Sequence, residues 1–243
     1  MKLIELRPPQ IRKATSENLP LILACGVVEY HGPHLPVGTD WLMASELLEE
    51  VERRIPQQCV LAPGFPLGPT GSWAGAPEDG ELDFPTEPFY QYVRAAIAGF
   101  LAMGFRRVLV CQLHQGVDGP QVLCLKRAAA ELAFEAGKNE GGGPGWGAVP
   151  IDRCPKVFER IQVFHPDSFL PPQFPKMGFS HAGYGETSYV LGCRPDLVHL
   201  PSLEGGENTP PWFEDAPAAN QAIGRKFFQA CVESWISVLS TTE

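Results

Sequence analysis

The stretch LPLILACGVV, Leu19–Val28, is the segment that decides the fold. It is short, and Leu, Ile and Val occupy both of the faces that a strand built from it would present. Strands of this kind belong to parallel sheets that are covered on both sides, whereas antiparallel strands usually alternate between apolar and polar positions. We therefore expect this stretch to be a buried strand of a mainly parallel sheet.

Segments of helical and strand character alternate after this first strand. Apolar residues recur at helical spacing over 40–55, and a short strand that breaks into a Pro/Gly loop is expected at residues 59–68. A helix is predicted over 87–104, a second buried strand over 108–113 and another helix over 119–137. Strands that alternate with helices predict an α/β fold of three layers, α/β/α, around a mainly parallel central sheet.

The second half of the chain is less regular. The Gly-rich segment 138–150 is expected to be a surface excursion, and residues 152–180 are rich in Pro and show no period that assigns an element. The sequence HAGYGETSYVLGC, residues 181–193, predicts a loop that runs into a helix, and an amphipathic helix is expected over 215–239. No linker interrupts the 243 residues, so we expect a single domain over 1–243.

Composition and charge narrow the function classes. The net charge of −9 argues against a nucleic-acid partner, because such proteins carry clustered Lys and Arg. The apolar runs fall short of the roughly 20 residues of a membrane span, and the first residues contain no signal-peptide core. The seven cysteines are scattered without a C-x-x-C pair, which is typical of reduced thiols. We expect a cytoplasmic protein without a membrane partner.

Polar residues cluster directly after the first strand, in the sequence VVEYHGPHLPVGTD. These residues are Glu29, His31, His34 and Asp40, and His114 follows the strand at 108–113. Ligands of an open parallel sheet bind beyond the carboxyl ends of its strands, which favours one shared site. Mixed carboxylate and imidazole donors suit zinc, manganese or iron, and a bridging carboxylate could hold two ions. From the residues alone, a metal site and a set of solvated loop residues both remain open.

Three segments resemble the creatininase (creatinine amidohydrolase) family. The sequence EYHGPHLPVGTD at 29–40 is similar to the family signature E-x-H-G-P-H-L-P-x-G-T-D. QLHQGV at 112–117 resembles an N-G-H-G-G-N-like turn, and HAGYGETS at 181–188 resembles H-A-G-x-x-E-T-S. The segments occur in the family order, and the resemblance covers most of the chain. It implies a creatininase-like α/β/α fold.

The resemblance also implies roles for single residues. Glu29, Asp40 and His114 match the ligands of one metal ion. His31 matches a ligand of a second ion, with Asp40 as the bridge between the two. His34, which lies between two prolines, is expected to shape the loop.

The third segment supplies two further candidates. The family's remaining carboxylate is a Glu that this chain replaces with Gly116, and Glu186 is the available substitute. His181 matches the histidine that transfers protons in creatininase, a task suited to an imidazole whose ordinary pKa is near 6.5. The turn at 112–117 departs from the family pattern, since Leu113 and Val117 stand where the family has Gly and Asn. Such departures can change how the neighbouring ligand is oriented.

The resemblance therefore implies a metal-dependent amidohydrolase. We expect it to hydrolyse a non-peptide C–N bond of an amide, cyclic amide or formamide, using a dinuclear site and metal-activated water. Zinc is favoured, with manganese or iron as alternatives, at one or two ions per chain. The expected partners are a small-molecule substrate and further copies of the chain, a hexamer by resemblance. The altered turn motivates an alternative, a catalytically idle member that binds a small ligand or serves in assembly.

Overall fold

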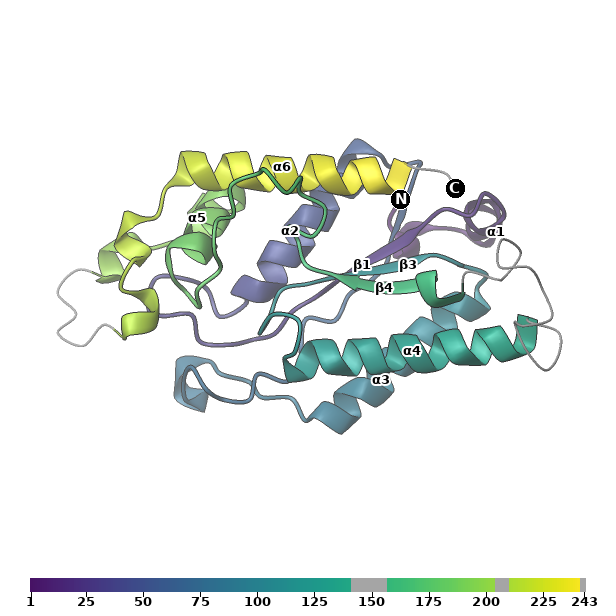
Figure 1. The fold of residues 1–243 in the computed structure, drawn as a ribbon, viewed down its shortest axis with the longest axis horizontal. Helices are drawn as coiled ribbons and strands as arrows, with labels where there is room; N and C mark the ends of the chain where they lie inside the picture. The colour runs from purple at the N-terminus through teal and green to yellow at the C-terminus, as the bar shows by residue number, and fades with distance from the viewer. Residues whose placement is uncertain (141–156, 204–209, 241–243) are drawn as a thin grey trace.

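The computed structural model describes residues 1–140, 157–203 and 210–240 (Figure 1). Within these residues one sheet contains four strands, in the spatial order β2-β1-β3-β4, and every neighbouring pair is parallel. The strands are β1 (Leu21–Cys25), β2 (Val60–Leu61), β3 (Val108–Gln112) and β4 (Ile161–Phe164). The prediction of an α/β fold around a parallel sheet is confirmed.

Helices cover both faces of this sheet. The helices are α1 (Pro8–Ser16), α2 (Thr39–Arg54), α3 (Thr86–Ala102), α4 (Pro120–Glu140), α5 (Tyr184–Cys193) and α6 (Gln221–Ser240). Short 3-10 helices connect them at Leu3–Glu5, Pro77–Asp79, Val157–Glu159, Pro195–Leu197, Leu200–Leu203, Pro211–Phe213 and Ala216–Ala218. Among the helices of the described residues, none combines the length and the apolar character that a membrane span requires.

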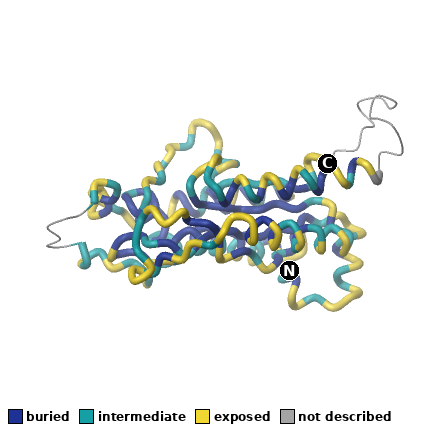
Figure 2. Tube along the Cα trace, turned by 90° about the horizontal axis from the view of Figure 1, so that it is seen from below, coloured by how far each residue is buried: buried dark blue, intermediate teal, exposed yellow. Residues whose placement is uncertain are grey.

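The two faces of β1 contribute to two separate hydrophobic cores, because successive side chains of a strand point to opposite sides. Leu21, Leu23 and Cys25 pack with residues of α1, α3 and α4. Ile22 and Ala24 pack with residues of α2, α5 and α6. Figure 1 shows the sheet between α6 on one side and α3 and α4 on the other, and Figure 2 shows buried segments running through the middle of the molecule. This is the three-layer α/β/α arrangement.

The register of β1 and β3 decides where the functional loops begin. Leu21 pairs with Val108, and the pairing continues to Cys25 with Gln112. The two central strands therefore end level with each other, at the same edge of the sheet. The loop after β1 and the turn after β3 leave this edge side by side, as expected from the strand order.

Several elements differ from the sequence-based expectations. Residues 152–180, for which the sequence predicted no element, contain the four-residue strand β4. The prolines around β4 hide the residue pattern typical of a strand. The short strand expected within 59–68 consists of the two residues of β2, and the Pro/Gly loop follows it. The last helix begins at Gln221 rather than near 215, because the Asn220 side chain caps it by accepting a hydrogen bond from the Ile223 amide. Helix α1 was not predicted, and most of the expected surface excursion at 138–150 lies outside the described residues.

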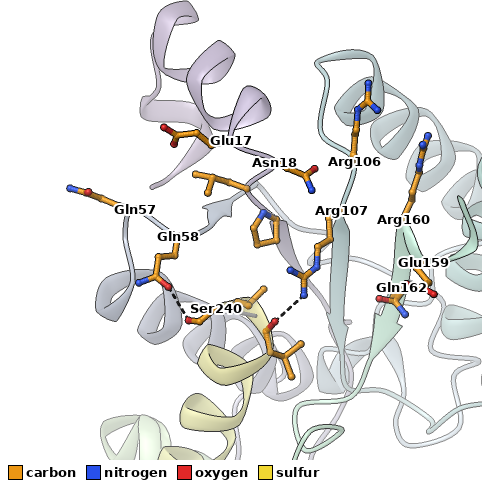
Figure 3. Close-up of a pocket in the computed structure, with 14 residues that line it drawn as sticks. Glu17, Asn18, Gln57, Gln58, Arg106, Arg107, Glu159, Arg160, Gln162 and Ser240 are labelled. Carbon is orange, nitrogen blue, oxygen red and sulfur yellow. Dashed lines mark hydrogen bonds between the residues drawn. The ribbon is translucent and has the colours of Figure 1, made fainter. Parts of the chain in front are cut away.

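A cavity of about 740 Å³ lies at the opposite edge, among the residues that precede the strands (Figure 3). Its walls include the end of α6. There the Arg107 guanidinium donates to the Val238 carbonyl at 2.9 Å, and the Ser240 hydroxyl donates to Gln58 at 2.9 Å (Figure 3). These bonds fasten the end of α6 to the sheet. None of the candidate site residues identified from the sequence lines this cavity.

Candidate metal centre

A second cavity, of about 550 Å³, opens at the carboxyl ends of β1 and β3. Five of the six predicted site residues line it: Glu29, Asp40, His114, His181 and Glu186. The sixth, His31, is fully buried and contacts three of these five. The structure therefore brings together all six residues singled out from the sequence.

Asp40 reaches this site because β1 and α2 approach closely. A Cβ atom at Gly26 would lie only 2.4 Å from the Trp41 Cα, so no residue with a side chain fits there without a backbone shift. The loop between them is closed by a hydrogen bond from the Glu29 amide to the Val37 carbonyl, at 2.8 Å. As a result Asp40, in the first turn of α2, lies beside Glu29 at the end of the strand, and both are buried.

The first group of possible metal-binding atoms belongs to Glu29, Asp40 and His114. His114 Nδ1 lies 2.9 Å from Asp40 Oδ2 and 3.2 Å from Glu29 Oε2. Only the contact with Asp40 has hydrogen-bond geometry, and among the described residues Glu29 Oε2 has no hydrogen-bond partner. Three buried donor atoms thus converge within 4.8 Å of one another.

The second group belongs to His31, Asp40 and Glu186. His31 Nε2 lies 3.5 Å from Asp40 Oδ1 and 3.6 Å from Glu186 Oε2. The other ring nitrogen, Nδ1, lies 3.0 Å from the Glu29 carbonyl oxygen, which can only accept, so Nδ1 carries the proton of this bond. That bond directs Nε2 at the carboxylates. Asp40 belongs to both of these groups and offers a different oxygen to each, while a third possible group consists of Glu29, His31 and His181.

Glu186 is positioned by α5 and by the packing of α5 on α6. A Cβ atom at Gly224 of α6 would lie 1.6 Å from the Ser188 carbonyl oxygen of α5, so only glycine permits this contact between the two backbones. The Glu186 carboxylate also accepts a hydrogen bond from the Ala182 amide at 2.6 Å. The helix expected after HAGYGETS is confirmed, and its first turn carries Glu186 into the site.

The His181 ring lies between His31 and Trp212, with ring centroids 4.3 and 4.9 Å away. Its Nε2 donates to the Tyr30 carbonyl at 2.7 Å. The Nδ1 atom therefore carries a lone pair, and it faces the site 3.8 Å from Glu29 Oε2. Burial, followed by the nearby His31, lowers the pKa of His181 below its ordinary value. The ring is thus neutral near pH 7 and can accept a proton.

The buried residues of the site carry several charges close together. Burial alone would lower the pKa of His31 and His114, but the adjacent carboxylates outweigh it and raise the values to about 10 and about 9. Burial would raise the pKa of Asp40, yet His31 and His114 hold it well below its usual range. Burial raises the pKa of Glu186 to about 7. Such a cluster of buried charge is costly without close compensation, which a bound cation would supply.

The turn at 112–117 still delivers His114 to the site. Gln115 and Gly116 both adopt left-handed backbone conformations, with φ values of 52° and 64°. The Gln112 side chain bridges the turn by donating to the Gly116 carbonyl at 3.3 Å, and Gln115 donates to the Thr70 carbonyl at 2.6 Å. Glutamine side chains thus hold a turn that lacks the asparagines of the family pattern.

Several residues that line this second cavity were not predicted from the sequence. Trp73, His165, Phe179 and Trp212 line it from four separate segments. None of these four residues belongs to the three segments that resemble the family, so those motifs did not point to them. His34 does not line the cavity, because its ring is buried behind the site against α5.

The family model described as "Creatininase: Creatinine amidohydrolase" matches residues 4–239. The chain belongs to the creatininase family. A curated relative of this creatininase-family chain is the "Mycofactocin precursor peptide peptidase" of Mycobacterium tuberculosis, 26% identical over 217 residues, which cover 83% of this chain and 71% of the relative. The protein of the same name from Mycobacterium ulcerans is 24% identical over 223 residues, with the same coverage of both chains.

Solved structures of other family members share the fold. "Crystal structure of creatinine amidohydrolase (creatininase)" superposes with a TM-score of 0.72 at 19% identity and covers 99% of this chain and 98% of that one. "Creatininase Mn" superposes with a TM-score of 0.71 at 20% identity, covering 98% and 96%. A mutant creatininase described as "Zn-Zn type" gives 0.69 at 19% identity, again covering 98% and 96%. The resemblance inferred from three sequence motifs is confirmed as family membership.

Proposed function

We propose that this creatininase-family chain is a metal-dependent hydrolase of an amide-type C–N bond, with two divalent ions that share Asp40. One observation carries the proposal. Asp40 turns Oδ2 toward His114, in the group with Glu29, and Oδ1 toward His31, in the group with Glu186. A carboxylate that offers one oxygen to each of two donor groups suits a bridging role between paired ions.

The donor set fits such ions. Glu29 and His114 would hold one ion, His31 and Glu186 the other, and Asp40 both. Glu29 Oε2 and His31 Nε2 are buried and lack hydrogen-bond partners in the part of the chain that the structure describes, as expected of atoms whose partner is a metal. Mixed carboxylate and imidazole donors favour zinc, with manganese or iron as alternatives, over magnesium or calcium. When bound, these ions would polarise the substrate carbonyl and lower the pKa of a water molecule.

His181 would move the proton that amide hydrolysis requires. The Tyr30 carbonyl fixes the proton of the ring on Nε2, so Nδ1 is free to accept a proton from the site. The protonated ring could then donate from Nδ1 to the departing nitrogen, which must gain a proton to leave as an amine. Since Nδ1 lies 3.8 Å from Glu29 Oε2, this exchange would take place beside the first group of donors.

The cavity supports a substrate larger than a single small ring. Its volume of about 550 Å³ lies within the range of pockets that enclose drug-sized molecules. The curated relatives are named as peptidases of a precursor peptide. We therefore widen the expected substrates, amides, cyclic amides and formamides, to include peptides.

Other expectations remain predictions about this protein. A single domain over 1–243, a homo-oligomer that is a hexamer by family resemblance, and a cytoplasmic location belong to this group. The six cysteines among the described residues are free, which agrees with a reducing compartment.

Elemental analysis of the purified protein, combined with an activity screen, tests the proposal. We expect one or two transition-metal ions per chain and turnover of at least one member of a panel of amides, formamides and short peptides. Asp40→Asn should lose most of the metal and the activity. Asp118→Asn makes the same chemical change on an exposed residue of the neighbouring turn and should keep both. A metal-replete protein without turnover on the whole panel would favour the catalytically idle alternative.

A further inference from the structure

Ala182, directly after the candidate proton carrier His181, has an unusual backbone. Its φ is 51°, in the left-handed region, which residues with a Cβ atom rarely adopt. It is also completely buried. The chain must hold this residue in place, because an unrestrained alanine would relax to a right-handed or extended conformation and rotate the peptide that joins it to His181.

Both ends of Ala182 are held by side chains. Its amide donates to Glu186 Oε2 at 2.6 Å. Its carbonyl oxygen lies 3.1 Å from His34 Nε2 and accepts a hydrogen bond from the Thr187 hydroxyl at 3.2 Å. His34 Nε2 also lies 3.0 Å from the Thr187 oxygen, so the three groups form one closed cluster. Because the carbonyl can only accept, the His34 proton is on Nε2.

His34 comes from a distant part of the chain and is itself firmly held. It lies 148 residues before Ala182, in the loop that carries Glu29 and His31. Its ring is only 1% exposed and packs against Phe213, and its carbonyl oxygen accepts a hydrogen bond from the His199 amide at 2.9 Å. The ring therefore connects the loop after β1 with the segment that begins at His181.

We propose that His34 and Thr187 are positioning residues, which hold Ala182 in the left-handed conformation and so aim His181 Nδ1 at the reacting atoms. The inference rests on the proposed function, because it concerns the group that moves the proton there. His34 itself neither lines the cavity nor belongs to a group of possible metal ligands. Because the Ala182 amide also holds Glu186, the effect of His34 on the orientation of His181 is best measured with metal in excess.

Two pairs of variants separate positioning from folding. His34→Leu and Thr187→Val remove the polar contact but keep the approximate size, whereas His34→Gln and Thr187→Ser keep a donor. Displacing a catalytic group by about 1 Å can cost roughly 100-fold in rate. With metal supplied in excess, we expect the first pair to lower kcat by about 10- to 100-fold and the second pair by less than about threefold, while KM stays near wild type.

A third variant tests the backbone conformation directly. Glycine adopts positive φ without strain, so Ala182→Gly introduced into His34→Leu should recover at least about tenfold of the lost kcat. An unchanged kcat in both His34→Leu and Thr187→Val would overturn the proposal. Full recovery of kcat on adding excess metal, or no recovery with Ala182→Gly, would also overturn it. If His34→Leu fails to fold, Thr187→Val provides the same comparison.

Hydrogen exchange keeps this inference separate from the proposed function. The Ala182 amide should be protected in the wild type, in His34→Gln and in Thr187→Ser, and should exchange faster in His34→Leu and Thr187→Val. This measurement by mass spectrometry requires no substrate. A wild-type protein without turnover would contradict the proposed function alone, whereas equal protection in all variants would contradict the role of His34 and Thr187.

Discussion

His114 Nδ1 lies 2.9 Å from Asp40 Oδ2, although 74 residues separate the two along the chain. Their meeting follows from the parallel pairing of β1 and β3, which end level at one edge of the sheet. Since His31 approaches the other oxygen of Asp40, this carboxylate is the point at which the two donor groups join.

Metal binding should release protons. The adjacent carboxylates outweigh burial and raise the pKa of His31 to about 10 and that of His114 to about 9, so both rings are protonated at pH 7.5 in the metal-free protein. Imidazole binds a metal only through a deprotonated nitrogen. Loading should therefore release about two protons per chain, and affinity should rise as the pH increases from about 7 to 9. Calorimetry in buffers of different ionisation enthalpy measures this number, and a value of zero would contradict the assignment of both histidines.

The approach of β1 to α2 should be sensitive to a single methyl group. In Gly26→Ala the new Cβ would meet the Trp41 backbone at 2.4 Å, which should push Asp40 away from Glu29. We expect a loss of about 1–3 kcal/mol in the free energy of unfolding and a marked loss of metal affinity. Gly38→Ala is the matched control, because a Cβ there has no atom within 4 Å. Thermal unfolding and metal titration of the two variants should separate them clearly.

His181 should act on turnover and not on metal content. His181→Gln is expected to lower kcat by about 100-fold or more and to leave the bound metal unchanged. Burial and the neighbouring His31 lower the pKa of His181, so the neutral form that accepts a proton persists to a pH below the ordinary value near 6.5. Activity that depends on neutral His181 should therefore fall only as the pH drops below about 6.5. A pH–rate profile with the acidic limb above 6.5 would argue against His181 as the acceptor.

Trp73 should affect substrate affinity alone. Its side chain is 83% exposed at the cavity, so Trp73→Ala should leave stability unchanged. Loss of an aromatic contact of about 1 kcal/mol would raise KM about fivefold for substrates with an apolar group beside the scissile bond. Ile4→Ala is the control, because it truncates another exposed apolar side chain that does not line the cavity. Steady-state kinetics with substrates that have and lack this group tests the expectation.

Much of this arrangement could be predicted from the sequence, and the reasons are physical. Leu19–Val28 and the strand at 108–113 are apolar on both faces, which places them inside a parallel sheet and puts Glu29 near His114. The roles of Glu186 and His181 came from the family resemblance, since neither lies near these strands in the chain. The left-handed Ala182 and the convergence of Trp73 with Trp212 could not be predicted, because tertiary contacts between distant segments determine them.

The two cores flanking the sheet differ in what they support. Leu35, Leu113, Ala182 and Phe213, which adjoin His34, His114, His181 and Trp212 in the sequence, all belong to the core shared by α2, α5 and α6. The core formed with α1, α3 and α4 contributes none of them. Evolution can therefore remodel the outer surfaces of α3 and α4, for new assemblies or new partners, without disturbing the chemistry at the carboxyl edge of the sheet. For an engineer, the same surfaces are the natural place to attach a tag, a tether or a second protein.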